Sequence, residues 1–194
     1  VFVGGVMMDE ARWPNQTGTM LSPTLANADA GTSATQVIDA ALPGNIDFTG
    51  ATMWIQSGWD WITQTPTITA YDAVAKKLTL GSLRATGGYS PESGDPYYLS
   101  GIKAALDTAN EWWYDSANSE LYLWAPNGVD PSTLTVDAKN RSTSFNLSGK
   151  GYIIIDGIQT IASTILTDSS SNHITLQRIV AKYLSHNKLN TSAL

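Results

Sequence analysis

The alternation of apolar and polar residues predicts short β-strands along most of the chain. Residues 65–71 and 77–83 alternate as half-buried strands do, with a short polar turn between them. The apolar and aromatic segments 111–115 and 121–126 flank five polar or small residues, which predicts a β-hairpin. A helix competes with a strand only over residues 97–107, where apolar residues have roughly helical spacing. Since no predicted helix is long, we expect an all-β protein.

A sequence repeat near the C-terminal end predicts a different architecture for that part of the chain. The segment Tyr-Ile-Ile-Ile-Asp-Gly-Ile at 152–158 is followed, 21 positions later, by His-Ile-Thr-Leu-Gln-Arg-Ile at 173–179. A fixed period of about 20 residues made of short apolar, β-prone runs is typical of a β-solenoid. Ile153 would then lie beside Ile174 on neighbouring strands of one sheet. Two sandwich strands that share this spacing by chance are the alternative.

The repeat divides the predicted fold into two parts. No such period occurs before it, so we expect a β-sandwich or barrel domain over residues 1–138. The first coils of a β-helix are expected over residues 139–194.

Composition and charge exclude several function classes. The 194 residues carry a formal net charge of −6, which disfavours nucleic acid as a partner. The absence of cysteine excludes disulfides and thiolate chemistry. No apolar run approaches the roughly 20 residues that span a bilayer, so no membrane partner is expected. Only 14% of residues are charged, as is typical of extracellular β-proteins, and we expect a secreted mature chain or fragment.

Three motifs together resemble a known family. They are Ala-Arg-Trp-Pro-Asn at 11–15, Glu-Trp-Trp-Tyr-Asp at 111–115 and Leu-Tyr-Leu-Trp-Ala-Pro at 121–126. These motifs resemble those of secreted bacterial right-handed parallel β-helix proteins of the pectate-lyase-like kind, which include glycoside hydrolases acting on plant and algal polysaccharides. In that family a β-sandwich or barrel domain interrupts the helix, and residues 146–157 resemble the point where the helix resumes. The resemblance implies a right-handed helix and a polysaccharide or oligosaccharide ligand.

The resemblance does not identify catalytic residues, because most of the family's groove would lie outside this sequence. Glycoside hydrolysis requires two carboxyl groups about 5–10 Å apart. Asp156 and Asp168, the acidic residues of the repeat, are weak candidates. A turn position favours a structural role for Asp156, and a surface loop explains Asp168 equally well. Glu111 and Asp115 flank an aromatic pair and could bind sugar hydroxyls, although the resemblance favours a scaffold role.

No metal site and no cofactor are predicted. His173 and His186 are the only histidines, and neither is accompanied by cysteine or by clustered acidic residues. The sequence has no Gly-rich phosphate loop, no nucleophile elbow and no EF-hand loop.

The seven tryptophans are the strongest sign of a ligand. A flat aromatic ring complements the C–H face of a pyranose. Trp59 and Trp61 would point to the same side of an extended strand, and with Tyr89 they are the candidate carbohydrate-binding residues. Packing in the core explains this pair of tryptophans equally well. Trp54 and Trp124 are predicted to fill the core.

Two functions remain open. The chain is part of a secreted polysaccharide-active β-helix protein, a glycoside hydrolase or polysaccharide lyase, and is expected to be inactive alone. The alternative is a non-catalytic module that binds glycan or self-associates through open coil ends.

Overall fold

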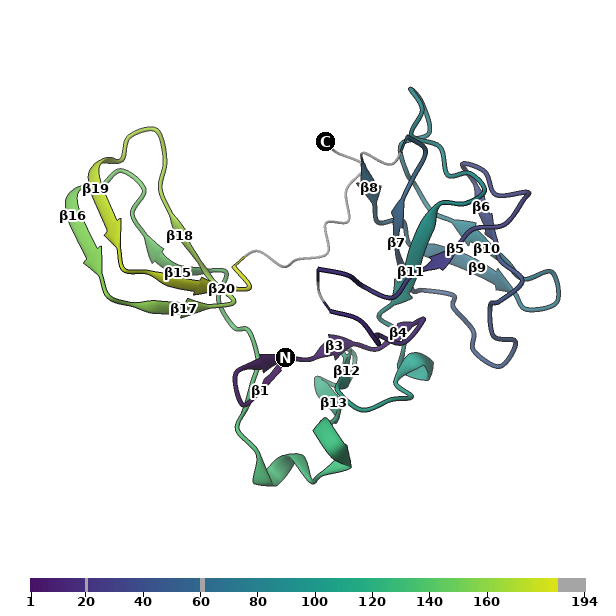
Figure 1. Cartoon of the computed structure of the whole chain (residues 1–194), viewed down its shortest axis with the longest axis horizontal. Coiled ribbons are helices and arrows are strands. Elements are labelled where there is room, and N and C mark those ends of the chain that lie inside the picture. The colour runs from purple at the N-terminus through teal and green to yellow at the C-terminus, as the bar shows by residue number, and fades with distance from the viewer. Residues whose placement is uncertain (20, 60–61, 185–194) are drawn as a thin grey trace. The chain divides into compact units, whose positions relative to one another are not determined.

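The computed structural model describes residues 1–19, 21–59 and 62–184 (Figure 1). The regular structure there is β-strand, apart from three short 3₁₀ turns at Lys103–Ala105 (η1), Pro126–Gly128 (η2) and Pro131–Thr133 (η3). The all-β prediction is therefore confirmed. The competing helix over residues 97–107 is reduced to η1, since β11 (Pro96–Ser100) takes up its first part. No helix in the described residues has the length and apolar character needed to cross a membrane.

The contacts divide the described residues into two compact units, residues 1–136 and residues 137–184. The core of the first unit lies between two antiparallel sheets. One sheet has the order β4–β11–β7–β8, with β5 also pairing β11, and the other has the order β6–β10–β9. The strands besides β11 are β4 (Arg12–Trp13), β5 (Ala26–Asn27), β6 (Gln36–Ile38), β7 (Thr52–Gln56), β8 (Thr63–Gln64), β9 (Ile68–Asp72) and β10 (Lys77–Leu80). No closed barrel is formed by the described strands.

The binary pattern of the sequence explains which side chains form this core. Met53 and Ile55 of β7 are fully buried, whereas the alternate residues of the strand are half-buried. Leu78 of β10 and Leu99 of β11 are also fully buried in the same cluster. Tyr97 is buried as well, and its hydroxyl donates to Asp39 Oδ2 at 2.7 Å, so its polar end has a partner.

Two small sheets complete the first unit. One has the order β14–β1–β2 and the other β13–β12–β3. Their strands are β1 (Phe2–Val3), β2 (Val6–Met7), β3 (Asp9–Glu10), β12 (Glu111–Asp115), β13 (Glu120–Trp124) and β14 (Val136–Asp137). The predicted hairpin is confirmed, because β12 and β13 pair antiparallel. β3 joins β12 in parallel, so residues about a hundred positions apart share a sheet.

The core assignment of Trp124 is wrong. Its side chain is 44% exposed at the end of β13, where the last residue of the strand lies at the surface. Trp54 is half-buried and stacks on Tyr98, with ring centroids 5.5 Å apart and an interplanar angle of 16°. Neither indole belongs to the fully buried cluster between the main sheets.

The second unit consists of two triplets of strands that pair in parallel. The first triplet is β15 (Thr143–Asn146), β16 (Gly151–Asp156) and β17 (Gln159–Ile161); the second is β18 (Thr164–Leu166), β19 (Asn172–Gln177) and β20 (Val180–Lys182). Each strand pairs with its counterpart, giving three two-stranded sheets. Ile153 pairs with Ile174 and Ile155 with Leu176, as the 21-residue period predicts.

Residues in the left-handed backbone conformation also recur every 21 positions. Positive φ angles occur in three pairs of residues 21 positions apart: Tyr152 and His173, Gly157 and Arg178, Ala162 and Tyr183. Five of these six are not glycine, although this conformation is uncommon for other residues. The backbone therefore turns at equivalent points in both triplets.

Burial differs between the triplets. Ile155 in the first is 8% exposed, whereas its partner Leu176 in the second is 45% exposed. Thr160 is 5% exposed, but its partner Ala181 is exposed. Within the described residues, Ile155 and Thr160 of the first triplet are therefore covered more completely than their partners in the second.

This difference predicts unequal effects of truncation at paired positions. Ile155→Ala should lower the free energy of unfolding of the second unit by about 3 kcal/mol, because it leaves a cavity. Leu176→Ala should lower it by only about 1 kcal/mol, since less apolar area leaves contact. Urea unfolding of the two variants measures both values. Equal losses would show that Leu176 is covered in solution, contrary to the burial seen here.

Candidate functional site

Two of the three predicted carbohydrate-binding residues lie on neighbouring loops of the first unit. Trp59 follows β7, and Tyr89 lies in the segment between β10 and β11. The Trp59 side chain is 67% exposed, and Tyr89 is half-buried. Trp61 lies outside the described residues. The structure thus brings Trp59 and Tyr89 to one region, although 30 positions separate them.

A buried glutamine connects the two loops. Gln64 is 5% exposed, and its side-chain nitrogen lies 2.8 Å from Ser57 Oγ, 2.8 Å from the Tyr89 carbonyl and 3.0 Å from the Arg84 carbonyl. Its side-chain oxygen accepts from the Arg84 N–H at 2.7 Å. The side-chain amide of Gln64 therefore forms hydrogen bonds with backbone groups of Arg84 and Tyr89 that lie outside any strand. These hydrogen bonds fix the path of the loop between β10 and β11.

Asp95 fixes the same loops from a second point. This residue is 3% exposed, and its Oδ2 accepts from the Gly58 N–H at 3.1 Å and from the Glu92 N–H at 2.8 Å. These two hydrogen bonds hold the segment before Trp59 close to the segment before β11.

Close approach of the two loops requires glycine. The Trp59 N–H donates to the Gly88 carbonyl at 3.2 Å. A Cβ atom on Gly88 would lie 2.4 Å from Cε2 of the Trp59 indole, and one on Gly58 would lie 2.0 Å from the Gly88 oxygen. The indole therefore packs against backbone at Gly88 while most of its surface faces solvent.

Arg84 adds positive charge beside these rings. Its guanidinium carbon lies 4.2 Å from the centroid of the Tyr89 ring, within the range of a cation–π contact. The Arg84 side chain is exposed. We call Trp59, Arg84 and Tyr89 the loop surface. It combines aromatic faces for stacking with N–H groups that donate hydrogen bonds.

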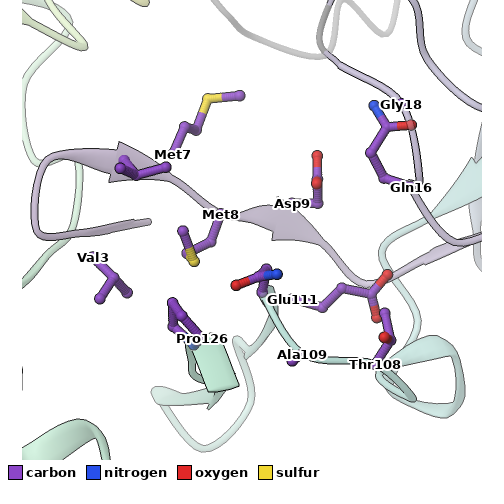
Figure 2. A pocket seen from close by; sticks show the side chains of 12 residues that line it. Val3, Met7, Met8, Asp9, Gln16, Gly18, Thr108, Ala109, Glu111 and Pro126 are labelled. Atoms are coloured by element: carbon purple, nitrogen blue, oxygen red, sulfur yellow. The ribbon is translucent and has the colours of Figure 1, made fainter. Parts of the chain in front are cut away.

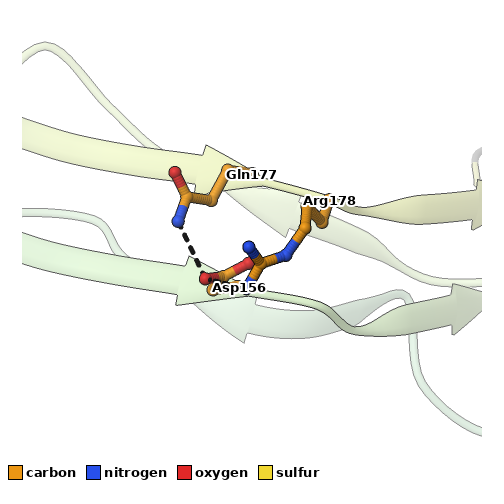
Figure 3. Close-up of polar contacts among 3 residues, drawn as sticks. All are labelled: Asp156, Gln177 and Arg178. Atoms are coloured by element: carbon orange, nitrogen blue, oxygen red, sulfur yellow. Dashed lines mark hydrogen bonds and ion pairs between the residues drawn. The ribbon is translucent and has the colours of Figure 1, made fainter.

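Asp156 has a structural position in the second unit. Its Oδ2 accepts from Gln177 Nε2 at 2.8 Å and pairs with Arg178 at 2.5 Å, so the first triplet is linked to the second (Figure 3). Its Oδ1 is buried and has no hydrogen bond. The register places Asp156 directly beside Gln177, which explains this link.

Asp168 closes a turn. Its Oδ1 accepts from the Gly149 N–H at 3.0 Å, the Ser170 N–H at 2.9 Å and the Ser171 hydroxyl at 3.1 Å. The backbone N–H of Gly149 is the main reason that the pKa of Asp168 is lowered. No hydrogen bond or ion pair among the described residues joins Asp168 to Asp156. The geometry supplies no reason to assign the pair an acid–base role.

Glu111 is the acidic residue that sequence reasoning undervalued. It begins β12, is 2% exposed, and accepts from the Arg12 N–H through Oε1 at 3.4 Å. Its Oε2 is buried without a hydrogen bond. Burial raises the pKa of Glu111 to about 7, although the N–H groups of Arg12 and Asp107 oppose this shift. The sequence did not indicate that Glu111 would be buried, because charged residues are usually exposed.

The remaining candidates show no metal site. Within the described residues, no three His, Asp or Glu side chains are grouped so that they could hold a metal ion. His173 stacks on Tyr152, with ring centroids 4.3 Å apart, and its Nδ1 lies 2.9 Å from Asn172 Oδ1. His186 lies outside the described residues.

No protein-family model, curated protein or solved structure matches this chain. The resemblance to β-helix proteins therefore stays a prediction from the sequence motifs.

The raised pKa of Glu111 predicts that stability depends on pH. The folded state binds this proton more tightly than the unfolded chain, whose glutamate has a pKa near 4.5. The stabilising contribution is therefore complete below pH 4.5 and is lost as the pH rises through about 7. This loss amounts to about 3 kcal/mol.

Urea unfolding over this pH range measures the effect. Glu111→Gln should remove most of the decline, because the amide does not ionise. Exposed Glu92, changed to Gln, is the control and should leave the decline in place. A native protein whose stability is constant over this range would contradict the prediction.

Proposed function

We propose that this chain is the glycan-binding part of a secreted polysaccharide-active protein and has no hydrolase or lyase activity by itself. The loop surface carries this proposal. Trp59 is 67% exposed, yet its loop is fixed by Gln64, Asp95 and the close contact with Gly88. An exposed aromatic ring on an ordered backbone loses little conformational entropy when a ligand stacks on it.

The loop surface also favours a class of glycan. The guanidinium of Arg84 lies over the Tyr89 ring, which leaves its N–H groups at the edge of that contact. A planar guanidinium binds carboxylate through paired hydrogen bonds. We therefore propose that the preferred ligand contains uronic acid residues, as pectin and alginate do.

The second unit supports the wider architecture that we propose. The pairs β16–β19 and β17–β20 keep a 21-residue register, and the left-handed turns repeat with the same period; the pair β15–β18 shifts by one residue. We propose that they are successive coils of a right-handed parallel β-helix, as the motif resemblance implies. Asp156 and Asp168 then serve as links between coils, which agrees with the absence of a catalytic pair.

A second function, self-association, is favoured by one observation. The second triplet exposes Leu176 and Val180, and its strands pair only with the first triplet among the described residues. An open strand edge with uncovered apolar side chains can add another strand layer.

The glycan proposal predicts the effect of removing the indole. Trp59→Ala should weaken binding to pectin or alginate about fivefold, because an exposed aromatic contact contributes about 1 kcal/mol. Isothermal titration calorimetry measures the change, with xylan and β-glucan as neutral or weakly charged comparisons. Trp124→Ala is the matched control, since it removes another exposed tryptophan of the same unit.

The two variants must be compared as folded proteins by circular dichroism. Full binding by folded Trp59→Ala, or equal losses in both variants, would contradict the assignment of this site. Unfolding of Trp59→Ala would show that the indole is needed for the structure. Tyr89→Phe, which keeps the ring, and Tyr89→Ala then test the same surface.

The preference for uronic acid makes a separate prediction. Arg84→Gln should weaken binding to oligouronates about tenfold, because charge-assisted hydrogen bonds contribute about 1.5 kcal/mol or more. Binding to a neutral oligosaccharide should change little, and the affinity for oligouronates should fall with added salt. Equal losses for charged and neutral ligands would show that Arg84 supports the loop and does not select the ligand.

A further inference from the structure

A cavity of about 420 Å³ lies beside β2, β3 and the start of β12 in the first unit. Val3, Met8 and Pro126 contribute apolar surface to it, and Asp9 and Glu111 contribute carboxyl groups (Figure 2). Its size falls within the range of small-molecule sites. The loop surface described above shares none of its lining, so this cavity is a separate feature.

Each of the two carboxyl groups has hydrogen-bonding capacity that the described residues do not use. Asp9 is half-buried, and its carboxylate makes no hydrogen bond among the described residues. Glu111 is 2% exposed, and its Oε2 is likewise without a hydrogen bond. Asp9 and Glu111 are register partners on adjacent parallel strands. Burial of unpartnered carboxylates is unfavourable, which is why the pKa of each is raised.

The nearest cation does not neutralise them. Arg12 Nε donates to the Pro14 carbonyl at 2.9 Å, and its Nη2 donates to the Thr24 carbonyl. The guanidinium also lies 4.1 Å from the centroid of the Tyr98 ring. The charge of Arg12 attracts both acids, but among the described residues it forms no ion pair with either. Two carboxyl groups and one guanidinium leave the cavity an excess of negative charge when both acids are ionised.

We propose that this cavity binds a small organic cation through a primary ammonium group. The ammonium has three N–H donors, and Asp9, Glu111 and the side-chain oxygen of Asn110 are acceptors on the cavity lining. Val3, Met8 and Pro126 would contact the carbon skeleton of the ligand. A metal ion fits less well, because calcium takes six or more oxygen ligands and no group of three acidic residues is present in the described chain.

An amino sugar and a free amino acid both present this chemistry. The experiment uses the whole chain and titrates glucosamine and lysine separately, followed by amide NMR shifts. N-acetylglucosamine is the control, because acetylation removes the positive charge. We expect shifts at residues lining the cavity with glucosamine, with lysine or with both, and none with N-acetylglucosamine. Binding of glucosamine alone identifies an amino sugar, and binding of lysine identifies an amino acid.

Two variants connect binding to the cavity. Asp9→Asn and Glu111→Gln should each weaken binding about tenfold or more, because each removes a charge-assisted hydrogen bond. Asp115→Asn, at the other end of the same strand and outside the cavity lining, is the control and should bind normally. Circular dichroism establishes that each variant is folded.

Binding should also depend on pH. Glu111 faces Asp9 on β3, Arg12 on β4 and Asp107 after η1, and burial raises the pKa of Glu111 to about 7. With lysine, whose side-chain ammonium stays charged in this range, affinity should therefore rise between about pH 5 and about pH 8, as Glu111 loses its proton. Glu111→Gln should bind weakly and without this rise.

Three results would overturn the proposal. They are no shift with either amine, equal binding of N-acetylglucosamine, and unchanged affinity in folded Asp9→Asn and Glu111→Gln. None of them bears on glycan binding at Trp59, which is measured with different ligands and variants.

Discussion

Short strands place a constraint on this protein: many backbone groups lie outside any sheet and must find other partners. Polar side chains supply them. Gln64 bonds to the backbone of Arg84 and Tyr89, and Asp95 accepts from two N–H groups. Asp168 does the same for a turn in the second unit. Because unpaired buried backbone groups cost free energy, these few side chains determine the paths of the loops.

This constraint also makes a binding surface possible. Long loops ordinarily lose conformational entropy when they bind, which weakens affinity. Here the loop before β11 is held at both ends, at Gln64 and at Asp95, independently of any ligand. The indole of Trp59 rests on the backbone of Gly88. An aromatic side chain can therefore remain exposed and still have a defined orientation, which is the property that stacking on a sugar requires.

The sequence allowed good prediction where periodicity carries the information. Alternation predicted the paired strands β9 and β10, and the 21-residue period placed Ile153 beside Ile174. Prediction failed where tertiary packing decides whether a side chain is buried. Trp124 has the apolar aromatic side chain of a core residue, but it lies exposed at the end of β13. The left-handed backbone at Tyr152 was also unpredictable, because an aromatic residue gives no local signal for it.

The acidic residues of the candidate sites were also hard to predict from the sequence. Carboxyl groups occur there in two opposite environments, one that favours the ionised form and one that disfavours it. Asp168 accepts backbone N–H groups, and its pKa is lowered, so its ionised form stabilises the fold. Glu111 is buried with an unpartnered oxygen, and its pKa is raised, so its ionised form destabilises the fold. The sequence singled out Asp168 as a catalytic candidate and treated Glu111 as scaffold. Since a cation would recover the free energy that burial of Glu111 costs, the unfavourable carboxylate is the better place to look for a ligand.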